Sequence, residues 1–272
     1  MTDKNIDEMT LQERMALMFK HPDEYHRLRE EENDRYFQEL LDKDPNTLPF
    51  YLYHGTDAKI VRMSQDERNR FFSACQSVID ALWPLFEPMH RESCYHRDVV
   101  ERVGMIPPSE KRQRYNCITG DISKVAMYKE ENKLYEYGDL YLANTIPTAA
   151  SYAFASKEGG EFGRLANSLL LGAELLEYDL AGLGDGFKVD AGIVRAMAKQ
   201  PAEPVLFCFL HLDLRKLFNS TGGKVYWKGD TTVEFRYLGE VELNLKRSVP
   251  VPDDYNPWTM DLGERIDAAK IY

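Results

Sequence analysis

The sequence predicts an α+β fold, and two kinds of apolar spacing support this prediction. In residues 10–41 and 64–82, apolar side chains recur every three or four positions, which is typical of amphipathic helices. Elsewhere they alternate with other residues or form short unbroken runs, which is typical of strands. The strand-like segments are 50–53, 140–142, 205–213, 224–227, 233–237 and 240–245. The chain therefore combines long helices with a set of short strands.

Length and charge restrict the class of protein. At 272 residues the chain can bury a continuous core, so it needs neither a metal nor a disulfide to fold. Its net charge of −11 argues against tight, non-specific nucleic-acid binding, because an acidic surface repels phosphates. The four cysteines form no CxxC pair and fit reduced thiols. There is no long apolar run and no export signal, so we expect a cytoplasmic protein without a membrane partner.

Residues 1–48 predict an acidic helical N-terminal lobe, since the first 45 positions hold thirteen acidic and seven basic side chains. Thr10 and Glu13 form a capping-box pattern, which predicts a helix over 10–20. Pro22 suits the first turn of a second helix. Two prolines within 42–49 break the helical pattern and predict a linker.

A strand should follow this linker. Aromatic residues alternate from Phe50 and the pattern breaks at His54-Gly55-Thr56, which predicts a strand that ends at a tight bend. We expect a second short strand over 59–62.

A helical insertion is predicted at about 64–133. Ser64 and Glu67 form a second capping box at the start of a strongly amphipathic pattern. Pro84 should end or kink this helix.

The remainder predicts a core of strands and helices up to residue 250, followed by a C-terminal tail over 251–272. After the strand at 140–142, Thr145 is expected to cap a helix that reaches Phe154. The other expected elements are a flexible connector over 156–163, a helix or a strand with a turn over 165–176, a short helix over 191–198 and a strand buried on both faces within 205–213.

Three stretches carry a resemblance to a known family: YHGT at 53–56, GDLYLANTIPTAASYA at 138–153, and TVEFRYLGEVEL at 232–243. Their order and spacing resemble the ADP-ribosyltransferase superfamily, in its poly(ADP-ribose) polymerase-like, diphtheria-toxin-like branch with a His-Tyr-Glu triad. The resemblance implies that residues 49–250 form a catalytic domain built on two small packed β-sheets.

The resemblance also implies an NAD site. His54 would hold the adenosine ribose, and the Gly55 backbone would bind the nicotinamide carboxamide. Tyr141 and Tyr152, eleven residues apart, would place an aromatic ring on each side of the nicotinamide. The NAD-binding residues of the matched motifs are His54, Gly55, Thr56, Tyr141, Ala143 and Tyr152.

Glu234 would be the catalytic carboxylate, with His54 and Tyr141 completing the triad. Cleavage between ribose C1′ and nicotinamide builds positive charge on the sugar, as in the transition states of glycosidases. A fixed carboxylate stabilises this charge and can orient the acceptor, while nicotinamide leaves as a neutral base. NAD is therefore a co-substrate and no metal is required.

The sequence departs from the family pattern at two positions. Many polymerase-type members have a serine where this chain has Ala149, so Thr148 or Ser151 would have to supply that contact to the carboxamide. Arginine-modifying toxins usually have a glutamate where this chain has Thr232, so arginine is not supported as the acceptor.

The expected activity is transfer of a single ADP-ribose from NAD to a macromolecular acceptor, either protein or nucleic acid. Family analogy implies a toxin-like or effector-like enzyme with an inhibitor protein as a further partner. Two alternatives stay open: an RNA 2′-phosphotransferase-like enzyme that also consumes NAD, and a non-catalytic module that binds ADP-ribose or a protein.

Each site residue also has an ordinary structural interpretation when taken singly. His54 fits a turn, both tyrosines fit a half-buried core, and Glu234 fits a solvent-facing strand position. His211 within the apolar run is expected to be a hydrogen-bonded core histidine.

Overall fold

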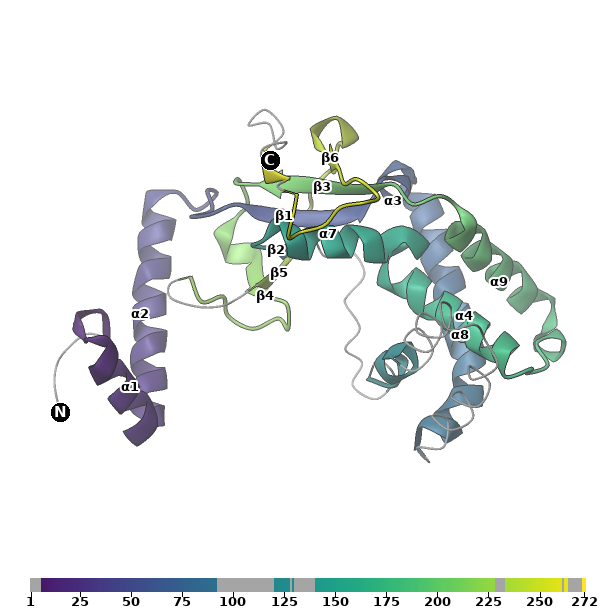
Figure 1. Cartoon of the computed structure of the whole chain (residues 1–272), viewed down its shortest axis with the longest axis horizontal. Helices are drawn as coiled ribbons and strands as arrows, with labels where there is room; N and C mark the ends of the chain where they lie inside the picture. Colours follow the sequence, from purple (N-terminus) through teal and green to yellow (C-terminus); the bar gives the residue numbers. More distant parts are fainter. Residues whose placement is uncertain are drawn as a thin grey trace.

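The computed structural model describes residues 6–91, 120–127, 129, 140–227, 233–260, 262–263 and 271–272. Within these residues the predicted α+β class is confirmed at the level of a mixed fold with one antiparallel sheet (Figure 1). The longer helices are α1 Leu11–Lys20, α2 Pro22–Lys43, α4 Gln65–Arg91, α7 Ile146–Ala155, α8 Gly160–Leu175 and α9 Gly184–Lys199.

The strands form a six-stranded sheet in the order β4-β5-β2-β1-β3-β6. Their bounds are β1 Leu52–Asp57, β2 Leu140–Ala143, β3 Pro204–Phe209, β4 Leu217–Asn219, β5 Glu234–Tyr237 and β6 Val249–Pro250. The expected pair of packed sheets is therefore wrong for the part of the chain that the structure describes. The halves β4-β5-β2 and β1-β3-β6 are joined edge to edge, because Tyr53 of β1 pairs with Ala143 of β2.

The two faces of the sheet carry side chains of different size, since successive residues of a strand point to opposite faces. Leu52, Phe207 and Phe235 belong to a cluster of large side chains on one face. Residues of α2 pack against this cluster, namely Tyr36, Phe37, Leu40 and Leu41. The other face carries Ala143 and Leu206 under α7, whose buried residues are alanines. Gly55 on the sheet and the alanines of α7 let the helix lie close to β1.

The N-terminal helices begin as the sequence predicts. Thr10 caps α1 by accepting a hydrogen bond from the Glu13 N–H at 3.3 Å, and the Glu13 carboxylate accepts from the Thr10 N–H at 2.7 Å. Pro22 occupies the first turn of α2. In Figure 1, α1 and α2 lie side by side at one end of the molecule.

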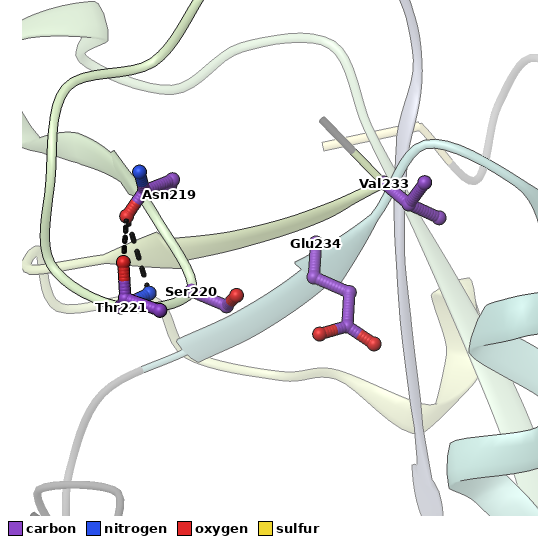
Figure 2. Close-up of a pocket in the computed structure, with 5 residues that line it drawn as sticks. All are labelled: Asn219, Ser220, Thr221, Val233 and Glu234. Atoms are coloured by element: carbon purple, nitrogen blue, oxygen red, sulfur yellow. Dashed lines mark hydrogen bonds between the residues drawn. The ribbon is translucent and has the colours of Figure 1, made fainter. Parts of the chain in front are cut away.

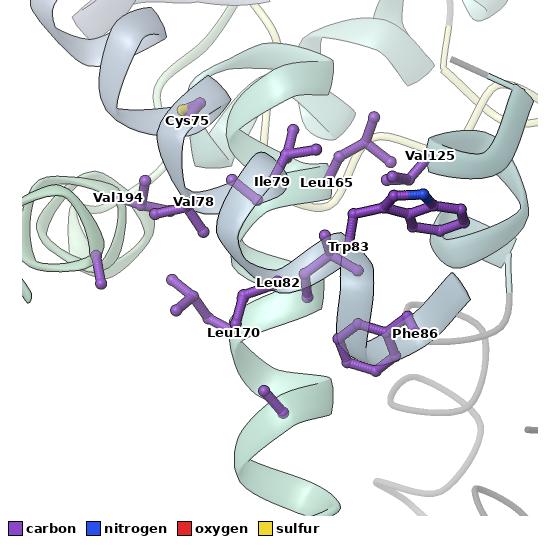
Figure 3. Close-up of a cluster of buried hydrophobic side chains, with 14 of the residues drawn as sticks. Cys75, Val78, Ile79, Leu82, Trp83, Phe86, Val125, Leu165, Leu170 and Val194 are labelled. Atoms are coloured by element: carbon purple, nitrogen blue, oxygen red, sulfur yellow. The ribbon is translucent and has the colours of Figure 1, made fainter. Parts of the chain in front are cut away.

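A helical cluster lies beside the sheet and contains α4, α8, α9 and a helical stretch at 120–127 (Figure 3). The second capping box is confirmed, since the Ser64 N–H donates to Glu67 at 2.7 Å. Pro84 does not end α4, because the helix continues to Arg91, and the alternative expectation of a kink stays a prediction. Trp83 and Phe86 are buried on either side of this proline, so their packing offsets the lost backbone hydrogen bond.

Several local predictions are corrected. The expected strand over 59–62 is instead helix α3, Ala58–Arg62, because the Asp57 side chain caps it by accepting from the Lys59 N–H at 3.0 Å. The expected connector at 156–163 contains a short 3-10 helix, Ser156–Glu158, and the start of α8. The apolar stretch at 165–176 is helical almost throughout, and the helix predicted over 191–198 begins earlier, at Gly184. None of the helices described here is long and apolar enough to cross a membrane.

Candidate functional site

The His-Gly-Thr motif lies inside β1 and not at a bend after it, because β1 pairs with β3 as far as Asp57. The Ala58 N–H donates to the Glu203 carbonyl at 2.8 Å, which continues this ladder. Backbone groups alternate in direction along an antiparallel strand, so those of Gly55 point away from β3 and toward β2. The Gly55 N–H and carbonyl therefore face the junction of the two half-sheets.

Gly55 must be a glycine because α7 crosses directly over it. A Cβ atom at this position would lie 1.7 Å from the Ala149 carbonyl oxygen and 2.9 Å from the Ala153 nitrogen, both of them backbone atoms of α7. The helix therefore rests on the Gly55 backbone. Gly55 is buried as a result.

His54 holds the junction between β1 and β2. Its Nδ1 lies 2.7 Å from the Tyr141 carbonyl oxygen, which can only accept a hydrogen bond. Burial lowers the pKa of His54, although its bond to Tyr141 acts in the opposite direction. The neutral ring therefore carries its proton on Nδ1 and leaves Nε2 as an acceptor. His54 is in register with Phe207, and its side chain lies on the same sheet face as the buried Thr56. Tyr141 and Glu234 lie on the opposite face.

Glu234 and Tyr152 are brought together by strand register and by α7. Ala143 of β2 pairs with Glu234 of β5, and both lie on the face that α7 covers. The Tyr152 hydroxyl donates a hydrogen bond to the Glu234 carboxylate. The small Ala143 side chain leaves room for this contact. Tyr141 lies on the same face, in register with Arg236.

Thr148 and Ser151, the residues expected to replace the missing serine, form hydrogen bonds within their own helix and its cap. Ala149 is fully buried on the side of α7 that faces the sheet. The Thr148 hydroxyl bonds that of Thr145 at 2.7 Å, while the exposed Ser151 hydroxyl donates to the Thr148 carbonyl of its own helix at 2.7 Å. Thr145 is the N-cap that starts α7 at the predicted place.

An open depression of about 230 Å³ lies beside Glu234 (Figure 2). Its lining consists of Glu234, Val233, Asn219, Ser220 and Thr221. The Ser220 N–H donates to the Glu234 carbonyl at 3.2 Å, so this turn is attached to the strand that carries the carboxylate.

Asn219 organises this turn, and the sequence interpretation did not identify it. Its Oδ1 accepts from the Thr221 N–H at 3.1 Å, the Thr221 hydroxyl at 2.8 Å and the Gly223 N–H at 2.7 Å. Gly222 has a positive φ of 83°, which suits glycine. The signal was present as an Asn-Ser-Thr-Gly-Gly run, which is typical of a side-chain-stabilised turn.

Other reactive residues do not form a second centre in the part of the chain that the structure describes. Burial raises the pKa of Cys75 to about 12 and that of Cys208 to about 11, so neither thiol is an activated nucleophile. No group of three or more potential metal ligands occurs among the described residues. His211 is exposed and lies 3.3 Å from the Thr47 hydroxyl, which corrects the expected core histidine. Its strand, β3, ends earlier, at Phe209.

Thr232 lies outside the described residues. The domain boundaries at 48 and 250 stay predictions, as does the insertion at about 64–133, much of which lies outside the described residues.

We expect Tyr152→Phe to separate the two contributions of this side chain. In the NAD site that the resemblance implies, the ring would still stack on the nicotinamide, so the KM for NAD should change by less than about threefold. Loss of a hydrogen bond to a carboxylate should lower kcat by about tenfold, since such bonds contribute ~1.5–3 kcal/mol. Steady-state kinetics of nicotinamide release measures both effects, and Tyr152→Leu, which removes the ring as well, should also raise KM. An unchanged kcat in Tyr152→Phe would contradict a role for the hydroxyl.

In comparisons with known proteins, no protein-family model, no curated protein and no solved structure matches the chain.

Proposed function

We propose that this protein is an NAD-dependent ADP-ribosyltransferase that transfers a single ADP-ribose to a macromolecular acceptor, either protein or nucleic acid. The observation that carries the proposal is the hydrogen bond from Tyr152 to Glu234. These residues belong to two motifs that are 82 positions apart, and they meet on the face that also bears Tyr141.

Backbone and ring groups at the junction support NAD as the co-substrate. A carboxamide has an oxygen that accepts hydrogen bonds and an NH2 group that donates two. The Gly55 N–H, which faces the junction, can donate to that oxygen, and the Gly55 carbonyl can accept from the NH2 group. Tyr141 and Tyr152 supply aromatic rings for the nicotinamide. His54 is not brought to the face of Tyr141 and Glu234, because its side chain starts from the opposite face of the sheet. Its Nδ1 donates to the Tyr141 carbonyl, so the proposal gives it the role of holding β1 beside β2.

Glu234 would act on the ribose. The C1′–N bond breaks with its electron pair going to nicotinamide, which leaves neutral, and positive charge spreads over C1′ and the ring oxygen. A carboxylate held by Tyr152 stabilises that charge without having to reorganise. The acceptor oxygen or nitrogen then bonds to C1′, and its proton passes through Glu234 to solvent. Glu234 is half-buried at an open depression, which leaves space for an acceptor.

The setting of this activity is part of the same proposal. A toxin-like or effector-like enzyme acting in the cytoplasm, controlled by an inhibitor protein, is the setting that the family analogy supports. The RNA 2′-phosphotransferase alternative is less well supported, because the net charge of −11 disfavours a phosphate-rich substrate.

The proposal is tested with NAD labelled in the nicotinamide ring and, separately, in the adenine. The wild-type protein should release labelled nicotinamide and leave the adenine label on a macromolecule from a cell extract. Glu234→Ala should do neither at a comparable rate. No release by the wild-type protein would favour a non-catalytic module, and equal release by both proteins would remove Glu234 from its assigned role.

A further inference from the structure

Asn33 of α2 binds the backbone of a distant segment that leads to the strand carrying Glu234. Its Nδ2 donates to the Val225 carbonyl at 2.9 Å, and its Oδ1 accepts from the Trp227 N–H at 2.7 Å. Asn33 is 2% exposed, so both bonds are shielded from water. One amide side chain thus satisfies two main-chain groups in the way a neighbouring strand would.

Neighbouring side chains of α2 hold the same segment. The rings of Phe37 and Trp227 are stacked, with centroids 5.7 Å apart and planes within 5°. Lys224 forms an ion pair with Asp34. Together with Asn33, these contacts fasten 224–227 to α2, and this explains why the strand predicted there is instead an extended segment bound by side chains.

This segment belongs to the connection between β4 and β5, which also forms the depression beside Glu234. At the start of the connection, Asn219 holds the turn whose residues Ser220 and Thr221 line the depression. Further along, Asn33 holds 225–227, and β5 begins seven positions after Trp227, at Glu234. The connection is therefore fastened at two points, one of them supplied by the N-terminal lobe.

We infer that Asn33 is a positioning residue for the reaction at Glu234: by fixing 225–227 it sets the placement of the Asn219 turn beside the carboxylate, because the Asn219 Nδ2 donates to the Lys224 carbonyl at 3.3 Å. This inference rests on the proposed function. The residues assigned to NAD lie on β1, β2 and α7, outside this connection. Loss of the Asn33 contacts should therefore lower turnover and leave NAD binding nearly unchanged.

The test compares Asn33→Leu, which keeps the branching of the side chain and removes both hydrogen bonds, with Gln38→Ala on the same helix. Gln38 is exposed, and within the described part of the chain its side chain bonds Asp42 of the same helix at 2.7 Å, so it is a matched control. Hydrogen exchange of the Trp227 amide reports the contact itself, and steady-state kinetics with NAD reports turnover. Asn33→Ser, whose hydroxyl can still serve one of the two backbone groups, replaces Asn33→Leu if that variant does not fold.

We expect Asn33→Leu to exchange the Trp227 amide about tenfold faster than wild type, since tenfold corresponds to about 1.4 kcal/mol, which lies within the usual cost of leaving a buried donor unsatisfied. Its kcat for ADP-ribose transfer should fall by about tenfold while the KM for NAD stays within about twofold, and Gln38→Ala should match wild type in both. Faster exchange with an unchanged kcat, or a kcat loss equalled by Gln38→Ala, overturns the positioning role. A wild-type protein that releases no nicotinamide overturns the proposed function itself, which is a distinct result.

Discussion

Replacing Glu234 with glutamine is expected to slow nicotinamide release by on the order of 10²–10³-fold, which is the usual cost of removing a preorganised electrostatic group. Glutamine keeps the size of the side chain and can still accept from Tyr152, so the fold should be unaffected. The KM for NAD should change little, because the carboxylate acts mainly on charge that develops in the transition state. Steady-state kinetics of nicotinamide release measures both quantities.

Glu240→Gln is the matched control for this change. Glu240 is exposed and close to Glu234 in the chain, and the substitution alters the net charge by the same amount. It should leave kcat within about twofold of wild type, as is usual for surface substitutions away from a site. If Glu234→Gln raised KM and left kcat intact, the carboxylate would be a binding group and the proposed mechanism would be wrong.

Replacing Gly55 with alanine is expected to destabilise the protein by roughly 3 kcal/mol, at the upper end of the usual range for overpacking. The added methyl group would lie 1.7 Å from the Ala149 carbonyl oxygen and 2.9 Å from the Ala153 nitrogen. Both are backbone atoms of α7, so no side chain can rotate away. Either α7 shifts or β1 bends. Urea unfolding measures the loss in the free energy of unfolding, and its slope shows whether the transition remains cooperative.

Gly192→Ala provides the opposite control in the same protein. This exposed position lies inside α9, where an added Cβ meets no atom within 4 Å, so alanine should raise the free energy of unfolding by about 0.5–1 kcal/mol. If Gly55→Ala were as stable as wild type, α7 would not rest on β1 in the manner described. The displacement of α7 should also separate Tyr152 from Glu234 and weaken nicotinamide release beyond the effect on stability.

Local signals predicted the starts of several helices, because the groups that cap a helix are close in sequence. Thr10 with Glu13, and Ser64 with Glu67, bond one another as their spacing predicts. The helix over 59–62 was missed because Asp57, which caps it, lies within a strand that the sequence predicts to end before it. Buried aromatic side chains beside Pro84 overrode the usual effect of proline.

Long-range partners set the limit of prediction. Residues 225–227 have the alternation of a strand, but their backbone is satisfied by Asn33, more than 190 positions away in the chain. The edge-to-edge union of the half-sheets depends likewise on a single register position between Tyr53 and Ala143, which no local pattern specifies. Among the site residues, the resemblance pointed to Glu234 and Tyr152, while Asn219 required the folded turn to be seen.

The order in which the chain builds the two half-sheets bears on how the protein can be divided. Along the chain, β1 belongs to the half β1-β3-β6 and β2 to the half β4-β5-β2. Next come β3 of the first half, β4 and β5 of the second, and finally β6 of the first. The halves are therefore interleaved along the polypeptide, and a fragment that ends before residue 204 holds only β1 of one half and β2 of the other. No contiguous fragment contains one half alone, so the sheet forms as a single cooperative unit whose assembly must wait for the C-terminal third of the chain.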